Sequence, residues 1–272
     1  MSGSVVVAGL GPGDPRLVTP EVQAALDMAT DILGYIPYVG RIAPRAGLSL
    51  HPSDNREELT RARHALELAR QGRHAVIVSS GDPGVFAMAS ALFEVLDAES
   101  SDTTVNIRIL PGITAMLAAA ARAGAPLGHD FCAINLSDNL KPWSVVEQRL
   151  RMAARGDFAM AFYNPRSKSR PHQFERVLEI LREECESQRL ITFARAVSTP
   201  DETLRTVTLE QATPDMADMR TVVIVGNSVP RHGGRWVVTP RLVTAPVAGP
   251  PYDQRMFYTT FLLRTLRATD SR

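Results

Sequence analysis

The sequence is poor in cysteine and has no long apolar run. Its 272 residues include only two cysteines, Cys132 and Cys185, which are too far apart to form a C-x-x-C metal or redox pair. They are expected to be buried thiols in a reducing compartment. No stretch reaches the 18 apolar residues typical of a membrane span, and a first strand beginning near Val5 leaves no room for a signal peptide. We therefore expect a cytoplasmic protein with no membrane partner.

An excess of one charge and the common catalytic motifs are missing as well. Lys and Arg number 30 against 29 Asp and Glu, so the net charge is +1, and a large nucleic-acid footprint is not indicated. The chain lacks a P-loop, an H-E-x-x-H motif and a G-x-S-x-G elbow, and its six histidines lack metal-ligand spacing. No metal site and no nucleic-acid partner are predicted.

What the sequence does contain is a glycine-rich turn near its beginning. The apolar run at 5–8 predicts a buried parallel strand, and the segment 9–13 then places glycine at every second position. The dinucleotide-binding fingerprint would require a glycine at Asp14 and a helix that begins inside the loop. Here the helix is expected to begin only with Thr19 as N-cap and Pro20 in the first turn. A nicotinamide or flavin site is therefore a weak interpretation, and a purely structural turn is the other alternative.

Two further strands end in the same manner. The apolar run at 74–79 leads into Ser-Gly-Asp-Pro-Gly at 80–84, and the run at 105–110 leads into Pro-Gly-Ile-Thr-Ala at 111–115. Ligands of open α/β sheets bind outside the carboxyl ends of the strands. We therefore expect the three glycine-rich junctions to meet at one binding site.

The alternation of strands and helices predicts two α/β domains. The first comprises residues 1–124, and the small, proline-bearing segment 124–128 is the candidate linker. The strand and helix pattern restarts in a second domain at 125–244. Residues 245–272 form a C-terminal extension with an amphipathic helix, read as a docking or dimer-contact helix, with a frayed tail as the alternative.

Three shorter segments of the sequence carry weaker patterns. Tyr35 and Tyr38 follow a short strand, and they either close the rim of a core or contact a ligand. Asp54 is expected to cap an amphipathic helix at about 56–70. The alternation of polar and apolar residues at 203–209 predicts a half-exposed antiparallel strand.

Two loops of the second domain carry charges. The loops 137–143 and 164–170 each follow an expected strand, and the latter holds Arg166, Lys168 and Arg170 within five positions. This cluster is either a solvated turn or a seat for carboxylates. A crevice lined by backbone groups on one side and by these cations on the other suits an adenosyl cofactor beside a polyanionic substrate. Group transfer by proximity then requires little side-chain chemistry.

Together these motifs resemble the tetrapyrrole (corrin/porphyrin) methyltransferases, over about residues 5–240 and in the order of that family. The motifs are Gly-Leu-Gly-Pro-Gly-Asp at 9–14 with Leu17 and Thr19, Ser-Gly-Asp-Pro at 80–83, Pro-Gly-Ile-Thr-Ala at 111–115, and Arg195-Ala196 with Glu202. The resemblance implies a class III S-adenosylmethionine-dependent methyltransferase: two α/β domains with a cofactor cleft between them, in a homodimer. It also implies cofactor contacts at Pro12, Ser80, Gly81, Asp82, Val85, Thr114, Ala115, Tyr163, Asn164 and Ala196.

Within this family the two charged loops resemble the branch that acts on precorrin-3B in cobalamin (vitamin B12) synthesis. That resemblance implies methylation at C17 with contraction of the macrocycle to precorrin-4. Contraction requires a base for the C20 hydroxyl, and Asp138 and Asp82 are the candidate catalytic residues, with a turn aspartate and a loop cap as their structural alternatives. Lys141, Arg166 and Lys168 are the candidates for holding peripheral carboxylates of the tetrapyrrole substrate.

Several other functions are compatible with the same motifs. They are methylation of another corrin position, the cobalt-containing counterpart of the same reaction, and methylation of RNA or of diphthamide by an enzyme of the same fold. The weak net charge argues against RNA. A nicotinamide-dependent enzyme and a noncatalytic sensor of an adenosyl ligand are the most distant alternatives.

Overall fold

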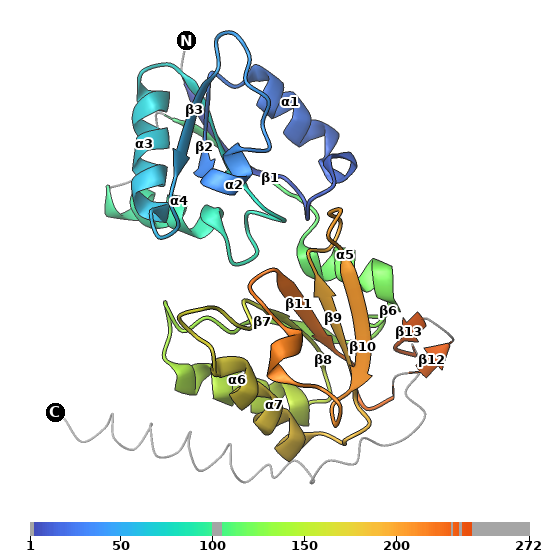
Figure 1. Ribbon diagram of the computed structural model, residues 1–272. Coiled ribbons are helices and arrows are strands. Elements are labelled where there is room, and N and C mark those ends of the chain that lie inside the picture. The colour runs from blue at the N-terminus through green and yellow to red at the C-terminus, as the bar shows by residue number, and fades with distance from the viewer. Residues whose placement is uncertain (1–2, 100–104, 230, 234–235, 241–272) are drawn as a thin grey trace, which may run out of the picture. The chain divides into compact units, whose positions relative to one another are not determined.

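The computed structural model describes residues 3–99, 105–229, 231–233 and 236–240. The helix expected within 245–272 lies outside these residues. The described chain forms two five-stranded sheets and a small three-stranded sheet, and helices cover both faces of each large sheet (Figure 1). The expected α/β class with two α/β domains is confirmed. Among the described residues, no helix combines the length and the apolar character that crossing a bilayer requires.

The first sheet is entirely parallel, with the strand order β3-β2-β4-β1-β5. Gly9 pairs with Ser79, and Ala8 pairs with Leu110, so the carboxyl ends of β1, β4 and β5 lie side by side. β1 and β4 are almost wholly buried because helices cover both of their faces. The strands are β1 (Ser4–Gly9), β2 (Asp31–Tyr35), β3 (Ser49–Ser53), β4 (His74–Ser79) and β5 (Asn106–Leu110).

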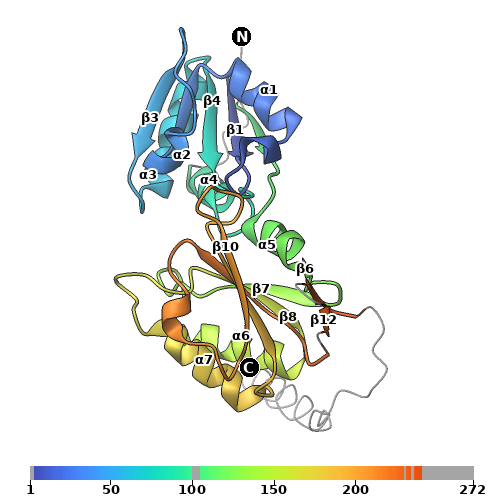
Figure 2. The same ribbon diagram turned by 45° about the vertical axis from the view of Figure 1, so that its right-hand side comes forward.

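Helices α1 (Pro20–Met28) and α2 (Ile36–Val39) pack on one face of this sheet, and α3 (Glu58–Arg70) and α4 (Met88–Ala98) pack on the other (Figure 2). The hydroxyl of Thr19 caps α1 by accepting a hydrogen bond from the Val22 N–H at 3.2 Å, as expected from the sequence. The 3-10 helix η1 (Pro15–Leu17) fills the interval between the glycine-rich turn and α1. The helix therefore begins well outside the loop, unlike that of a dinucleotide-binding turn.

The prediction that Asp54 caps helix α3 is wrong. This helix begins at Glu58, and no side chain caps it. Arg56 has a left-handed backbone with φ of 72°, so the chain turns between Asp54 and the helix. The backbone carbonyl of Asp54 instead accepts a hydrogen bond from Arg61 Nη2 at 2.9 Å. Asp54 thus lies too far upstream to reach the first N–H groups of the helix.

The second sheet is mixed, with the strand order β10-β9-β11-β8-β7. β7 and β8 are parallel, whereas β11 is antiparallel to both β8 and β9, so β7, β8 and β9 run in one direction. β10 is antiparallel to β9, which confirms the expectation for 203–209. The strands are β7 (Phe131–Asn135), β8 (Ala159–Tyr163), β9 (Leu190–Arg195), β10 (Thr203–Thr208) and β11 (Thr221–Val225).

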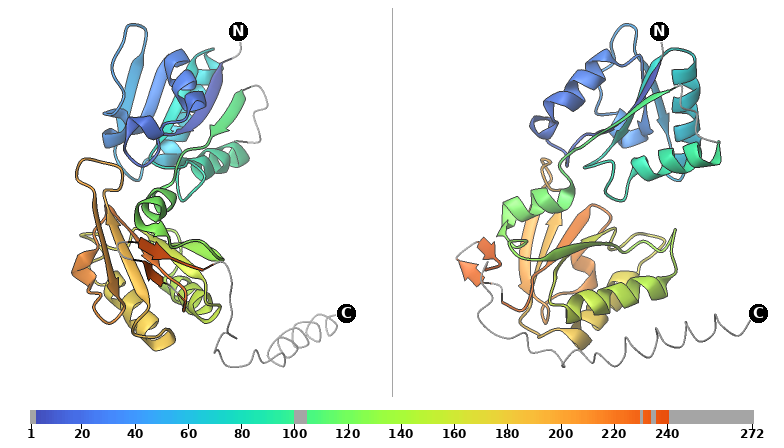
Figure 3. Two further views of the ribbon diagram at one scale, coloured as in Figure 1. Left: turned by 90° about the vertical axis from the view of Figure 1, so that its right-hand side faces the viewer. Right: turned by 180° about the vertical axis from the view of Figure 1, so that it is seen from behind.

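Helix α5 (Ala115–Ala123) packs on one face of the second sheet, and α6 (Trp143–Arg155) and α7 (Gln173–Glu184) pack on the other (Figure 3). Ala118 and Ala119 of α5 are buried with Val222 and Ile224 of β11. The 3-10 helix η2 (Pro214–Met216) lies beside α7. α5 therefore follows the last strand of the first sheet but contributes its apolar face to the second.

The expected linker is itself partly a strand. β6 (Gly124–Ala125) pairs in parallel with β13 (Trp236–Val238), which pairs antiparallel with β12 (Arg231–Gly233). Gly124 has φ of 125°, and a Cβ there would lie 2.8 Å from the Val237 carbonyl oxygen. A larger residue would therefore prevent this pairing.

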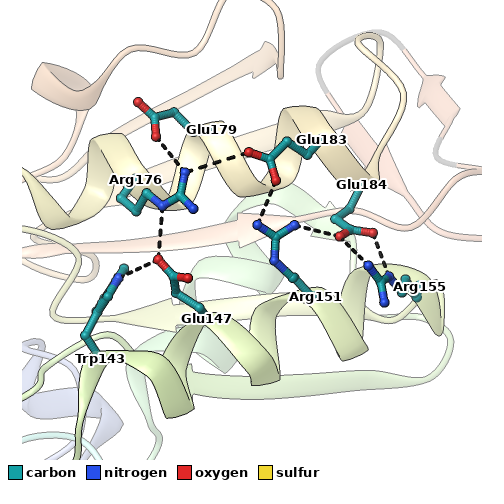
Figure 4. Close-up of polar contacts among 8 residues, drawn as sticks. All are labelled: Trp143, Glu147, Arg151, Arg155, Arg176, Glu179, Glu183 and Glu184. Atoms are coloured by element: carbon teal, nitrogen blue, oxygen red, sulfur yellow. Dashed lines mark hydrogen bonds and ion pairs between the residues drawn. The ribbon is translucent and has the colours of Figure 1, made fainter.

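A chain of ion pairs joins α6 to α7 on the outer side of these helices (Figure 4). Arg151 of α6 donates from Nη1 to Glu184 and from Nη2 to Glu183 of α7, each at 2.7 Å. The hydrogen bond from Arg155 is the main reason that the pKa of Glu184 is lowered. Glu184 is half-buried and pairs with both Arg151 and Arg155, so this part of the chain of ion pairs ties the ends of α6 and α7 together.

Candidate functional site

The loops that follow β1 and β4 are joined by their backbones. The N–H of Gly11 donates to the carbonyl oxygen of Gly81 at 3.2 Å, and the N–H of Gly81 donates to the carbonyl oxygen of Gly11 at 2.9 Å. Leu10 continues the pairing by donating to the Ser79 carbonyl oxygen at 2.8 Å. The expectation that these glycine-rich junctions meet is confirmed.

The loop after β5 closes against the other two. A Cβ added at Gly112 would lie 2.1 Å from the carbonyl oxygen of Gly81, and one added at Gly9 would lie 2.7 Å from the backbone nitrogen of Gly112. Gly81 itself has a left-handed backbone, with φ of 64°. The three loops thus form a cradle whose floor is backbone, because no side chain fits between them. We call the loops 9–14, 80–84 and 111–114 the cradle.

Asp82 holds two of these loops together. Its Oδ1 accepts a hydrogen bond from the Gly84 N–H at 2.8 Å, and its Oδ2 accepts one from the Gly112 N–H at 3.0 Å. This placement matches the loop cap that was the structural alternative to catalysis. Each carboxylate oxygen keeps a second lone pair for a ligand.

Tyr163, the last residue of β8, reaches the beginning of α5. Its phenol oxygen accepts a hydrogen bond from the Met116 N–H at 3.0 Å and lies 2.5 Å from the hydroxyl oxygen of Thr114. Burial raises the pKa of Tyr163, with a smaller contribution from the negative charge of Asp82. The structure therefore brings Tyr163 to Thr114 and Ala115, two other expected cofactor contacts that lie almost fifty positions earlier in the sequence.

Asn164 and Ala196 occupy corresponding places at the ends of β8 and β9. Both have left-handed backbones, with φ of 53° and 48°, a conformation that is uncommon for residues other than glycine. The Asn164 side chain donates to Asn135 Oδ1 at 3.1 Å, and the Ala196 N–H donates to the Arg220 carbonyl oxygen at 2.8 Å. Since β7, β8 and β9 run in one direction, these residues follow the same edge of the second sheet.

The remaining expected cofactor contacts lie within the cradle loops. Pro12 is half-buried between two glycines, and Ser80 follows the end of β4. Val85 is half-buried, and its N–H donates to the Asp82 carbonyl oxygen at 3.3 Å. Their contact with a cofactor stays a prediction.

Two residues that brace the cradle were not identified from the sequence. Arg41 Nη2 donates to the carbonyl oxygens of Leu10 at 2.8 Å and Gly13 at 3.3 Å. Tyr38 forms a hydrogen bond with the side chain of Ser80, and burial is the main cause of its raised pKa. From the sequence, Tyr38 could close the rim of a core or contact a ligand. No local pattern around Arg41 predicted its hydrogen bonds to a loop about thirty positions earlier.

The candidate substrate-binding cations differ in how they are engaged. Lys141 Nζ donates to the carbonyl oxygens of Asn135 at 2.7 Å and Ser137 at 2.9 Å, and burial lowers its pKa. Arg166 Nε donates to the Pro171 carbonyl oxygen at 3.2 Å. Lys168 is exposed and makes no hydrogen bond or ion pair with the residues that the structure describes. Lys141 and Arg166 thus stabilise their own loops, whereas Lys168 is available to a ligand.

Asp138 is exposed in the loop between β7 and α6, and its carboxylate has no hydrogen bond or ion pair within the described part of the chain. Its neighbour Leu140 is 99% exposed. Among residues 3–99, 105–229, 231–233 and 236–240, no group of three or more His, Cys, Asp or Glu side chains is placed to hold a metal ion.

Comparison with known proteins shows which family this chain resembles. The family model of the tetrapyrrole (corrin/porphyrin) methylases matches residues 4–213. A precorrin-3B C(17)-methyltransferase from a Sinorhizobium species is 48% identical over 228 residues, which are 84% of this chain and 90% of the relative.

Two solved structures resemble the chain. The methyltransferase CobJ is 74% identical, with a TM-score of 0.87 over 88% of this chain and 100% of its own. A uroporphyrin-III C-methyltransferase from Thermus thermophilus, complexed with S-adenosylhomocysteine, is 24% identical, with a TM-score of 0.64 over 82% of this chain and 97% of its own. The second likeness shows the fold alone.

Proposed function

Because the chain belongs to the tetrapyrrole (corrin/porphyrin) methylase family, we propose that it methylates C17 of precorrin-3B in cobalamin biosynthesis. The observation that carries this proposal is the 48% identity to a precorrin-3B C(17)-methyltransferase, which extends over 90% of that relative. The 74% identity to the methyltransferase CobJ supports it. We propose further that methylation is coupled to contraction of the macrocycle, with precorrin-4 as the product.

The methyl donor in this proposal is S-adenosylmethionine, which supplies an electrophilic methyl group when bound. The cradle suits it because the closely packed Gly9, Gly81 and Gly112 make its floor from backbone rather than from bulky side chains. The uroporphyrin-III methyltransferase of similar fold was solved with S-adenosylhomocysteine, the product of such a donor. The residues that would hold the cofactor are Pro12, Ser80, Gly81, Asp82, Val85, Thr114, Ala115, Tyr163, Asn164 and Ala196.

Asp138 is the proposed base for the C20 hydroxyl. Its carboxylate is exposed and makes no hydrogen bond or ion pair with the described residues, so it can turn toward a substrate proton. Asp82 is the second candidate, but both of its oxygens are engaged with N–H groups of the cradle. We therefore assign Asp82 chiefly to positioning of the loops and Asp138 to proton transfer.

The cations of the second domain would hold the peripheral carboxylates of the substrate. Lys168 has the freest side chain, and Arg166 and Lys141 keep part of their hydrogen-bonding capacity after their bonds to the loop carbonyls. Charge-assisted hydrogen bonds of this kind are stronger than those between neutral groups. They would orient the macrocycle before the methyl group is transferred.

The assembly and the compartment are also proposals. We infer a homodimer from the family resemblance, which sedimentation velocity of the purified chain would test. The unpaired thiols of Cys132 and Cys185 suit a reducing compartment such as the cytoplasm.

The proposed reaction is tested by incubating the purified full chain with methyl-labelled S-adenosylmethionine and precorrin-3B, followed by NMR of the product. A labelled methyl group on C17 together with an extruded acetyl group supports both halves of the proposal. A methyl group on another carbon overturns the C17 assignment. A parallel incubation with the cobalt-containing counterpart tests which of the two substrates is used.

Replacement of the proposed base provides a second test. Asp138→Asn should retain cofactor binding and lose ring contraction. Asp130→Asn is the matched control, because Asp130 is also an exposed aspartate of the second domain and lies outside the proposed site. Contraction by Asp138→Asn at the parental rate would remove Asp138 from this role.

A further inference from the structure

A hollow of about 430 Å³ opens beside the cradle, where no cofactor contact was expected. Its volume lies within the range of small-molecule sites. One wall is the segment 13–16 after β1, another is the segment 198–202 after β9, and Arg122 from the last turn of α5 completes it. It shares Gly13 and Asp14 with the cradle but contains none of the ten proposed cofactor contacts.

The two walls are in direct contact at Gly13. A Cβ on this glycine would lie 2.5 Å from Thr199 Cγ2 and 2.9 Å from the Ser198 carbonyl oxygen. The end of the hollow next to the cradle is therefore fixed by close packing rather than by flexible side chains. A ligand group in the hollow would lie near whatever the cradle holds.

Each wall supplies one carboxylate that is anchored by the backbone. Asp14 accepts a hydrogen bond from the Arg16 N–H at 2.9 Å, and Glu202 accepts one from the Ser198 N–H at 2.5 Å. Asp14 also binds the Arg16 side chain at 2.6 Å, and Glu202 binds Arg122 at 3.2 Å. These anchored carboxylates hold both guanidinium groups at the hollow.

Both guanidinium groups keep unused donors. Arg16 binds Asp14 through Nε and Nη2, and Arg122 binds Glu202 through Nε. Nη1 of Arg16 and both Nη atoms of Arg122 have no hydrogen-bond partner among the residues that the structure describes. The two side chains are 87% and 51% exposed, so these donors are accessible. A guanidinium with free Nη donors is suited to a carboxylate.

We propose that Arg16 and Arg122 form a carboxylate subsite beside the cradle, which binds an acidic side chain of the tetrapyrrole substrate. This inference rests on the proposed function. The ligand carboxylate accepts hydrogen bonds from the free Nη groups, while the ion pairs to Asp14 and Glu202 stay intact and orient the arginines. A carboxylate is favoured over a cation because the arginines present most of the charged surface, at 87% and 51% exposed against 18% for Asp14 and 26% for Glu202. The subsite is separate from the cations at Lys141, Arg166 and Lys168, so it would fix a second point of the macrocycle.

The test measures methyl transfer and cofactor binding separately in Arg16→Gln, Arg122→Gln and the double variant. Loss of one charged hydrogen bond typically weakens binding about 10-fold or more, and we expect KM for precorrin-3B to rise about 10-fold in each single variant. Because both arginines bind the same carboxylate, their effects are not expected to add fully, and the double variant should raise KM more than either single variant does. The dissociation constant of S-adenosylhomocysteine and kcat should each stay within about 2-fold in all three. Arg16→Lys should recover part of the loss, because it retains the charge.

Arg108→Gln is the matched control. Arg108 forms an exposed ion pair with Glu21 and is 52% exposed, close to the 51% of Arg122, but lies outside the hollow. Its KM should equal that of the parent.

The outcomes separate failure of this inference from failure of the proposed function. If the parent transfers the methyl group and the double variant has the parental KM, no substrate carboxylate binds in the hollow and the inference is overturned. If the affinity for S-adenosylhomocysteine falls while KM for precorrin-3B is unchanged, the hollow belongs to the cofactor, which also overturns it. If the parent itself transfers no methyl group to precorrin-3B or its cobalt-containing counterpart, the proposed function fails first and this inference fails with it.

Discussion

The phenol oxygen of Tyr163 lies 2.5 Å from the hydroxyl oxygen of Thr114, so the end of β8 is tied to the residue that precedes α5. The same phenol accepts the Met116 N–H, one of the first N–H groups of the helix, which no other side chain caps. Tyr163 therefore replaces the usual capping side chain of α5. This contact joins the last loop of the cradle to the second sheet.

Tyr163→Phe should destabilise the protein by about 1–3 kcal/mol, because the Met116 N–H loses its acceptor while the ring is retained. Urea unfolding at pH 7 measures the change in the free energy of unfolding. Tyr35→Phe is the control, since the Tyr35 hydroxyl has no hydrogen bond to the residues that the structure describes. Equal stability of the two variants would contradict the capping role.

Gly112→Ala should open the cradle, because its Cβ would lie 2.1 Å from the Gly81 carbonyl oxygen, and backbone cannot move aside as a flexible side chain can. We expect a loss of stability of about 3 kcal/mol or more and weaker binding of S-adenosylhomocysteine. Gly40→Ala is the control, since its Cβ would find its nearest neighbour at 3.4 Å and its φ is not left-handed. The prediction fails if both variants unfold at the same urea concentration.

Asp31 should make the protein sensitive to acid. Its carboxylate is 1% exposed, and burial alone would raise its pKa, but hydrogen bonds from Arg73, His51 and Thr30 outweigh burial and lower it. A carboxyl group with a lowered pKa stabilises the fold above its unfolded pKa of about 3.9 and loses this contribution as the pH falls below that value.

Asp31→Asn should therefore lose about 2 kcal/mol at pH 7, and the difference from the parent should shrink between about pH 4 and pH 2. Urea titrations at several pH values measure this. Asp97→Asn, which changes an exposed aspartate of α4 without an ion pair among the described residues, should follow the parent throughout. A constant difference between Asp31→Asn and the parent across this range would contradict the role of the Asp31 charge.

Cys185 should be unreactive in the folded protein. Burial raises its pKa to about 11, so about one thousandth of the thiol is ionised at pH 8, and the thiolate is the reactive form. Burial also raises the pKa of Cys132. Iodoacetamide at pH 8 should label both slowly in buffer and rapidly in 8 M urea, as followed by mass spectrometry. Rapid labelling of the native protein at Cys185 would show that the thiol is more accessible than the structure indicates.

Local patterns in the sequence were sufficient for much of the fold and for the location of the cradle. Each glycine-rich junction directly follows an apolar strand, and Thr19 directly precedes the apolar face of α1. Such patterns involve residues only a few positions apart, so they can be recognised without knowledge of the tertiary structure. Asp54 shows the limit, because a left-handed residue between it and α3 removes it from the helix.

The contacts that complete the site required the folded chain. Thr114 and Tyr163 are 49 positions apart, and Arg41 lies 28 positions from Gly13. Arg16 lies in the 3-10 helix after β1 and Arg122 lies in the last turn of α5, yet both line the same hollow. No local sequence pattern links these two segments. Strand order and register determine which of these residues meet, and both depend on the packing of whole sheets. The residue types therefore indicated the chemistry, whereas their pairing followed from topology.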